Sequence, residues 1–194
     1  NAVYLDDHWQ LVDATWGSGY INTDKKFVRE VTDYWFLTKP EQFIYAHFPE
    51  NSQWQLLSPP KTLKDFQSSA KFSGRFFTYG LNPKDNSLAR IKTKDSMSLS
   101  FQVPSNVLLS SSLSYWKNGL IKGRYSFERR RGDQVEVLVS FPKAGIYELT
   151  IYAKYLTDEG PLNSVVSYRV DSTGGNPRQT FAKTFGKYLT APVY

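Results

Sequence analysis

Apolar and polar residues alternate along three stretches of this 194-residue chain, 97–103, 135–141 and 147–153. In each stretch every second residue is apolar, and the residues between are mostly Ser, Gln, Glu or Thr. A period of two is typical of a β-strand that buries one face. We therefore expect three half-buried strands in the second half of the chain.

Shorter apolar segments at 72–79, 108–116 and 165–170 are further strand candidates. The pairs Asn118-Gly119 and Gly132-Asp133 are favoured in the tight turns of β-hairpins. The count is roughly seven strands over about a hundred residues, as in an immunoglobulin-like sandwich. The predicted fold of residues 61–194 is an immunoglobulin-like antiparallel β-sandwich.

One local motif supports this prediction. The segment Ala144–Leu149 resembles the entry to strand F of immunoglobulin-like domains, where a tyrosine returns its hydroxyl to the backbone a few residues upstream. Tyr147 is the candidate for this tyrosine corner, and Leu149 takes the place of the core cysteine. The alternative is that Tyr147 is an ordinary strand residue.

Residues 1–60 show a different pattern. A hairpin is expected around Asp6-Asp7, between strands at 1–5 and 9–13. Lys39-Pro40 is expected to start a short helix, since proline is favoured in the first turn. Thr23 or Asp24 is a candidate cap for another short helix or turn.

Charge and aromatic residues divide the chain near Ser58-Pro59-Pro60. Residues 1–60 carry a net charge of −4 and residues 61–194 a net charge of +10, and four of the five Trp fall in the first part. Such a shift at a proline-rich segment marks a domain boundary. We expect two domains, 1–60 and 61–194, the second with a closing helix over 179–189.

Composition excludes several kinds of site. The chain has no cysteine, which rules out disulfides, thiolate metal ligands and a cysteine nucleophile. Its two histidines are 39 positions apart and no acidic cluster has metal-loop spacing, so we expect no metal and no cofactor. The apolar runs are too short for a membrane span. The basic residues are scattered along strands, so nucleic acid is not an expected partner.

The first 57 residues resemble the transglutaminase-like superfamily, closest to the branch that contains kyphoscoliosis peptidase and hillarin. The resemblance rests on Asn1–Tyr4, on Leu11–Gly19 with its Val-Asp-x-Thr-Trp-Gly motif, and on the blocks Tyr34–Thr38, Phe43–Glu50 and Trp54–Leu57. It implies that residues 1–60 are the C-terminal remnant of a transglutaminase-like α+β domain. In this branch immunoglobulin-like domains follow, and the parent proteins are linked to the cytoskeleton.

The resemblance gives Asp13 the position of the aspartate in a Cys-His-Asp triad. In that chemistry a thiolate attacks an acyl group, a histidine accepts its proton, and the aspartate orients the histidine. The family's histidine and cysteine have no counterpart in these 194 residues. Asp13 is therefore an orphan triad residue, not active alone. We expect neither of the two histidines to be catalytic. His8 is expected to be solvated or paired at the surface, and His47 to pack or to bond to the backbone.

In the resembling family a helix carries the triad's cysteine. Without that helix, one face of the remaining sheet is expected to be uncovered, and this face includes some of Val3, Trp9, Leu11 and Trp16. A large exposed apolar face of this kind usually marks an interaction site. We expect it to meet a protein partner or a second copy of the chain.

Two further binding candidates lie in the predicted sandwich. Arg131-Gly132-Asp133 spells the tripeptide that integrins bind, at a predicted hairpin tip, although Gly-Asp is also ordinary turn chemistry. Trp116 is a candidate platform for a sugar ring, although packing at the core or rim is the favoured explanation.

The sequence thus predicts a mainly β fragment of a transglutaminase-like protein that acts as a structural or protein-interaction module. The expected location is the cytoplasm, beside the cytoskeleton, and the parent remains a candidate acyl transferase or peptidase. The alternative is a secreted, extracellular β-sandwich that binds carbohydrate or mediates adhesion.

Overall fold

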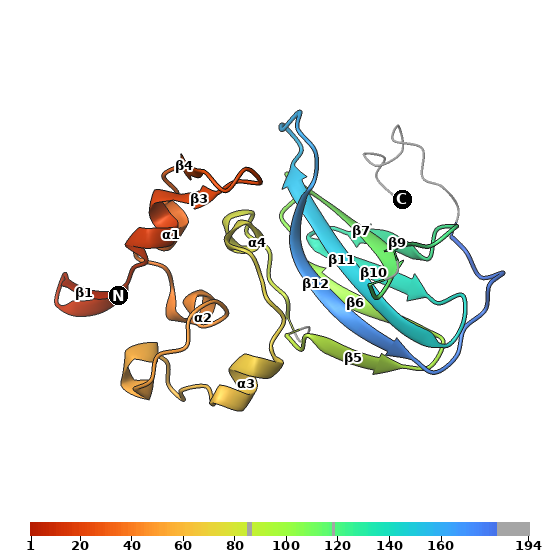
Figure 1. Cartoon of the computed structure of the whole chain (residues 1–194), viewed down its shortest axis with the longest axis horizontal. Helices are drawn as coiled ribbons and strands as arrows, with labels where there is room; N and C mark the ends of the chain where they lie inside the picture. The colour runs from red at the N-terminus through yellow and green to blue at the C-terminus, as the bar shows by residue number, and fades with distance from the viewer. Residues whose placement is uncertain (85–86, 118, 182–194) are drawn as a thin grey trace. The chain divides into compact units, whose positions relative to one another are not determined.

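The structure, a computed structural model, describes residues 1–84, 87–117 and 119–181. The chain forms two compact units, an N-terminal unit of Asn1–Ser69 and a C-terminal unit that starts at Ala70 (Figure 1). Within the described residues, no helix is both long enough and apolar enough to cross a membrane.

The C-terminal unit is built from two β-sheets, which meet where β7 contacts β9 and β10 (Figure 1). The smaller sheet has three strands in the order β6 (Ser96–Gln102), β10 (Gln134–Ser140) and β9 (Ser126–Arg131). The larger has five, in the order β5 (Arg90–Thr93), β12 (Asn163–Ser172), β11 (Gly145–Tyr155), β7 (Val107–Tyr115) and β8 (Gly119–Leu120). All pairs are antiparallel except β5 with β12. The chain is therefore mainly β, with an immunoglobulin-like sandwich as predicted.

The three alternating stretches are strands, and their apolar residues form the core. On β11, every second side chain from Tyr147 to Ala153 is fully buried. On β10, Val135, Val137 and Val139 are buried opposite Leu99 and Phe101 of β6. The alternation therefore identified the buried face of each strand.

A β-bulge interrupts the pairing of β11 with β12. Ile151 pairs with Val166 and Tyr152 with Ser164, so Val165 is an extra residue. The bulge lets the consecutive side chains of Val165 and Val166 both be buried. The Val165 carbonyl accepts a hydrogen bond from the Ser73 N–H at 2.9 Å, which ties the bulge to the segment before the sheets.

The tyrosine corner at Tyr147 is present. Its side chain is fully buried, and its hydroxyl donates to the carbonyl oxygen of Lys143 at 2.7 Å. Burial raises the pKa of the hydroxyl, which stays protonated as a donor. The bond fixes the turn that leads into β11.

The strand predicted at 72–79 is wrong, because this segment contains the helix α4 (Gly74–Thr78). Phe72, Phe76 and Tyr79 are buried, and their spacing of four and three matches one face of a helix. In a short aromatic run, the two-residue period of a strand and the 3.6-residue period of a helix are hard to tell apart. Sequence reasoning also missed β5 and the charged strand β9.

The N-terminal unit consists of short elements. The predicted hairpin is present as β1 (Ala2–Leu5) and β2 (His8–Leu11), with Asp6 and Asp7 at positive φ in the turn. The other elements are α1 (Ala14–Ser18), β3 (Gly19–Ile21), β4 (Phe27–Arg29), η1 (Asp33–Trp35), α2 (Pro40–Phe43), η2 (Ser52–Gln55) and α3 (Leu63–Ser68).

Two local predictions for this unit have different outcomes. Pro40 is the first residue of α2, as expected. The turn between β3 and β4 is held by the side chain of Asn22, which accepts from the N–H groups of Asp24 and Lys26, and not by Thr23 or Asp24. The closing helix predicted at 179–189 lies mostly outside the described residues.

The tyrosine corner provides a stability test. Tyr147→Phe keeps the ring but removes the donor to the Lys143 carbonyl, so we expect unfolding to become easier by about 1 kcal/mol. The matched control is Tyr152→Phe on the opposite face of β11. The hydroxyl of Tyr152 only accepts a long, exposed bond from Ser112 at 3.3 Å, so this substitution should cost less than about 0.5 kcal/mol. Urea unfolding followed by fluorescence measures both. Equal stability of the two variants would show that the corner bond contributes nothing.

Candidate functional site

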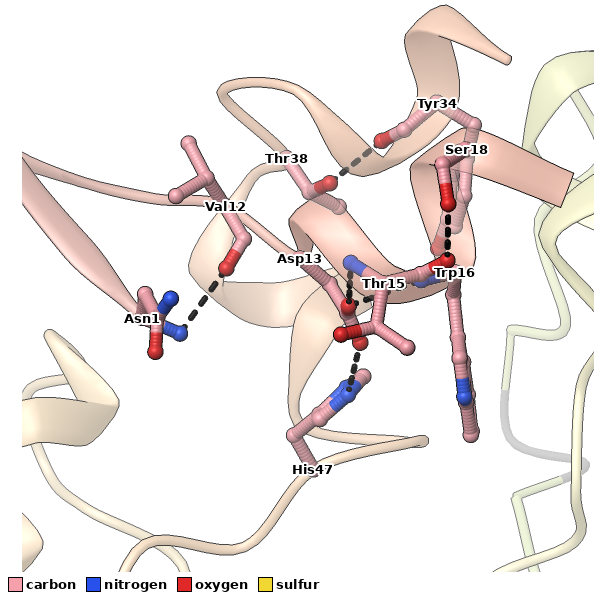
Figure 2. Close-up of polar contacts among 9 residues, drawn as sticks. All are labelled: Asn1, Val12, Asp13, Thr15, Trp16, Ser18, Tyr34, Thr38 and His47. Atoms are coloured by element: carbon pink, nitrogen blue, oxygen red, sulfur yellow. Dashed lines mark hydrogen bonds and ion pairs between the residues drawn. The ribbon is translucent and has the colours of Figure 1, made fainter. Parts of the chain in front are cut away.

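Asp13 lies at the junction between β2 and α1 and caps the helix. Its Oδ1 atom accepts hydrogen bonds from the backbone N–H groups of Thr15 and Trp16, both at 2.9 Å (Figure 2). The residue is extended, with φ −126° and ψ 96°, as an N-cap requires. The Val-Asp-x-Thr-Trp-Gly motif is thus the link that follows β2 and the capped helical turn that it enters.

The second carboxylate oxygen of Asp13 pairs with His47. The His47 Nε2 atom lies 2.7 Å from Asp13 Oδ2, and the two side chains are 29% and 14% exposed, respectively (Figure 2). This pairing was not foreseen, since the two residues are 34 positions apart and no spacing rule connects them. The sequence predicts that His47 packs or bonds to the backbone, and the bond to the Asp13 carboxylate is an addition that the structure makes.

His47 does pack, inside a cluster of aromatic rings. Its imidazole is stacked on Phe43, with ring centroids 4.3 Å apart, and contacts Trp16 and Trp35 at 4.9 and 5.4 Å. Its Nδ1 atom is buried and has no hydrogen-bond partner among the described residues. The ring is therefore held by aromatic contacts on its sides and by Asp13 at one nitrogen.

The environment of Asp13 favours its ionised form. Burial alone would raise the pKa of the carboxyl, but hydrogen bonds from the Trp16 N–H and from His47, together with the charge of His47, lower the pKa below the ordinary value. The carboxylate thus accepts three hydrogen bonds from within its own unit. Nothing in this arrangement supplies a nucleophile.

A pocket of about 690 Å³ lies in the N-terminal unit, with His47 in its wall. Its lining is mostly apolar and includes Trp9, Leu11, Phe43, Phe48 and Trp54. We call it the aromatic pocket. The Trp9 and Trp54 rings meet edge to face, 5.0 Å apart.

The face expected to be uncovered is only partly so. Trp9 and Trp16 are 46% and 48% exposed, and Val3 is half-buried. Leu11, by contrast, is buried and does not contribute to an open face. Leu11 is covered because its backbone carbonyl accepts from Thr38, which folds the 38–44 segment against β2.

The remaining site candidates do not join Asp13 and His47. His8 is exposed in the hairpin turn, where its Nδ1 lies 2.8 Å from the Asp6 carbonyl oxygen. Among the described residues, no group of three or more metal-binding side chains comes together.

The two binding candidates lie in the C-terminal unit. Arg131, Gly132 and Asp133 are all exposed at the turn between β9 and β10. Trp116 is half-buried, and the Arg169 guanidinium lies over its ring at 5.3 Å. One face of this indole is therefore covered.

These features define a chain with an immunoglobulin-like sandwich preceded by a small, aromatic-rich unit. The family described as "KY-like, immunoglobulin-like domain" matches residues 63–183. The chain belongs to this family.

Two relatives of the chain share one name. The chain is 34% identical to kyphoscoliosis peptidase of Mus musculus over 158 residues, which is 79% of this chain and 23% of that protein. It is 33% identical to kyphoscoliosis peptidase of Homo sapiens over 162 residues, which is 81% of this chain and 23% of that protein. Hillarin of Drosophila melanogaster is 27% identical over 184 residues, which is 82% of this chain and 22% of hillarin. The chain thus spans about a quarter of the length of these relatives.

Each alignment covers more of the chain than the C-terminal unit holds, so the similarity extends into the N-terminal unit. This agrees with the resemblance seen in residues 1–57. The chain corresponds to a fragment of a kyphoscoliosis peptidase-like protein.

The lowered pKa of Asp13 predicts a pH-dependent stability. A carboxyl whose pKa is lower in the folded state stabilises the fold above its unfolded pKa, near about 3.9, and loses that contribution as the pH falls through the folded value. Asp13→Asn keeps a capping side chain but removes the charge. We expect the stability difference between wild type and Asp13→Asn to shrink as the pH falls from about 5 to below the folded pKa. Urea unfolding at a series of pH values measures it, and a difference independent of pH would contradict the account.

Proposed function

We propose that this chain is a non-catalytic structural and protein-interaction module of a kyphoscoliosis peptidase-like protein. In this proposal residues 1–60 are the C-terminal remnant of a transglutaminase-like domain, and residues 61–194 are its immunoglobulin-like β-sandwich with a closing helix. The parent protein is the candidate acyl transferase or peptidase. We place the module in the cytoplasm, beside the cytoskeleton, as the resemblance to the hillarin branch implies.

The bonding of Asp13 is the observation that carries the proposal. A triad aspartate must offer an oxygen to the histidine that activates the nucleophile. In this chain one oxygen of Asp13 caps α1 and the other pairs with His47. The 194 residues contain no cysteine for His47 to activate. The carboxylate therefore serves the local fold.

The proposal predicts no catalysis by the isolated chain. In assays for incorporation of a fluorescent amine into a glutamine-containing protein, and for cleavage of a casein substrate, the chain should match the buffer blank. An active transglutaminase and an active protease serve as positive controls. Turnover that either Asp13→Asn or His47→Gln abolishes would contradict the proposal, because those substitutions would then be removing catalytic groups.

Adhesion through Arg131-Gly132-Asp133 is the second candidate function. Its support is the full exposure of all three residues at one hairpin tip. Against it, the Asp133 carbonyl oxygen accepts from the Val103 N–H at 2.7 Å and the Gly132 carbonyl from Arg130 at 3.2 Å, as in an ordinary fixed turn. Sugar binding at Trp116 has less support, because Arg169 covers one face of the ring.

A cell-adhesion assay separates these explanations. Plates coated with the chain or with Asp133→Glu should hold integrin-bearing cells equally poorly if the turn is only structural. Loss of adhesion in Asp133→Glu, with adhesion retained in an Asp158→Glu control at another exposed carboxylate, would favour the adhesion function instead.

A further inference from the structure

We propose that the aromatic pocket binds a basic segment of a partner protein, one that presents a large apolar side chain next to Lys or Arg. The inference rests on the proposed interaction role and specifies the surface and the chemistry of the partner.

The pocket calls for an apolar group. The rings of Trp9 and Trp54 are 46% and 37% exposed and stand almost perpendicular to each other, at 88°. Tyr4, 57% exposed, extends the row, with its ring 5.4 Å from that of Trp9. Exposed, rigid aromatic rings beside a hollow are the usual anchors of a protein interface, because they lose little entropy on binding.

Polar ligands find few partners in this pocket. Both side-chain polar atoms of Gln55 are bonded to the backbone of Lys61, at 2.8 and 2.9 Å. The Nε2 atom of His47 is taken by Asp13, and its Nδ1 atom is buried. A sugar, which needs hydrogen bonds for its hydroxyl groups, therefore fits less well than an apolar side chain.

The segments that supply the lining residues of the pocket carry more negative than positive charge. The segments that line it, 1–11 and 43–55, contain Asp6, Asp7 and Glu50 and no lysine or arginine. These three side chains are exposed, and none forms an ion pair with a described residue.

Two groups near the lining are positive. The amino group of Asn1 donates to the Val12 carbonyl oxygen. Lys61 bonds Gln55 through its backbone, and its ammonium lies over the Tyr45 ring at 4.5 Å.

Charge complementarity selects the partner. Carboxylates within roughly 10 Å attract a Lys or Arg at ordinary salt concentrations, and an indole face adds a cation–π attraction. An acidic peptide or a nucleic acid would be repelled. The occupant that satisfies both the apolar lining and the charge is a basic, apolar peptide segment.

A peptide-display selection against the whole 194-residue chain tests the proposal. Random peptides that bind should be enriched in Lys or Arg close to Leu, Phe or Trp. A synthetic copy of the best peptide should lose at least about tenfold in affinity for Trp9→Ala or Trp54→Ala. It should lose about threefold for Asp6→Asn/Asp7→Asn, with the loss reduced at high salt.

Matched substitutions in the C-terminal unit serve as controls. Leu120→Ala removes an apolar side chain that is 95% exposed, and Asp158→Asn/Glu159→Gln removes two exposed carboxylates. Both should leave the affinity unchanged. Circular dichroism confirms that each variant is folded, which the exposure of the replaced side chains favours.

Three results would overturn the proposal: no enriched peptide, peptides without basic residues, or binding that neither Trp substitution weakens. Binding that maps to the C-terminal unit would overturn the pocket while leaving the wider interaction role intact. Catalysis by the chain would instead overturn the proposed function without touching the pocket.

Discussion

The carboxylate of Asp13 is the interaction on which the N-terminal unit depends. One oxygen fixes the start of α1, and the other holds His47, which stands among the rings of Phe43, Trp16 and Trp35. The backbone of Asp13 adds a bond from its N–H to the Trp35 carbonyl at 2.8 Å. One residue thus joins β2, α1, η1 and the 43–49 segment. Such short elements bury little apolar surface each, so a shared polar junction matters more here than in a large sheet.

The C-terminal unit is held together in a different way. Its two sheets bury alternating apolar residues, and its polar bonds lock particular turns, as Tyr147 does at the entry to β11. The family match falls on this unit and the helix before it. In our proposal the sandwich is the structural support, and the N-terminal unit supplies a surface of exposed aromatic rings and carboxylates.

The sequence predicted what is periodic or local. Alternation identified β6, β10 and β11 with their buried faces, and the turn chemistry of Asp6-Asp7 and Pro40 identified the first hairpin and α2. It failed at 72–79, where buried aromatic residues at helical spacing also fit a strand. It could not find the pairing of Asp13 with His47, because that contact depends on how η1 and α2 return the chain to α1. Asp13 was identified by motif, whereas its role became visible only with its neighbours.

The central claim is that the carboxylate of Asp13 is used by the fold through His47. A double-mutant cycle of Asp13→Ala and His47→Ala, read from the free energy of unfolding, tests it most directly. The account predicts that the two substitutions are coupled, with an interaction energy of about 1–2 kcal/mol in favour of the wild-type pair. Additive effects, with a coupling energy near zero, would show that the two residues act independently and would contradict the claim.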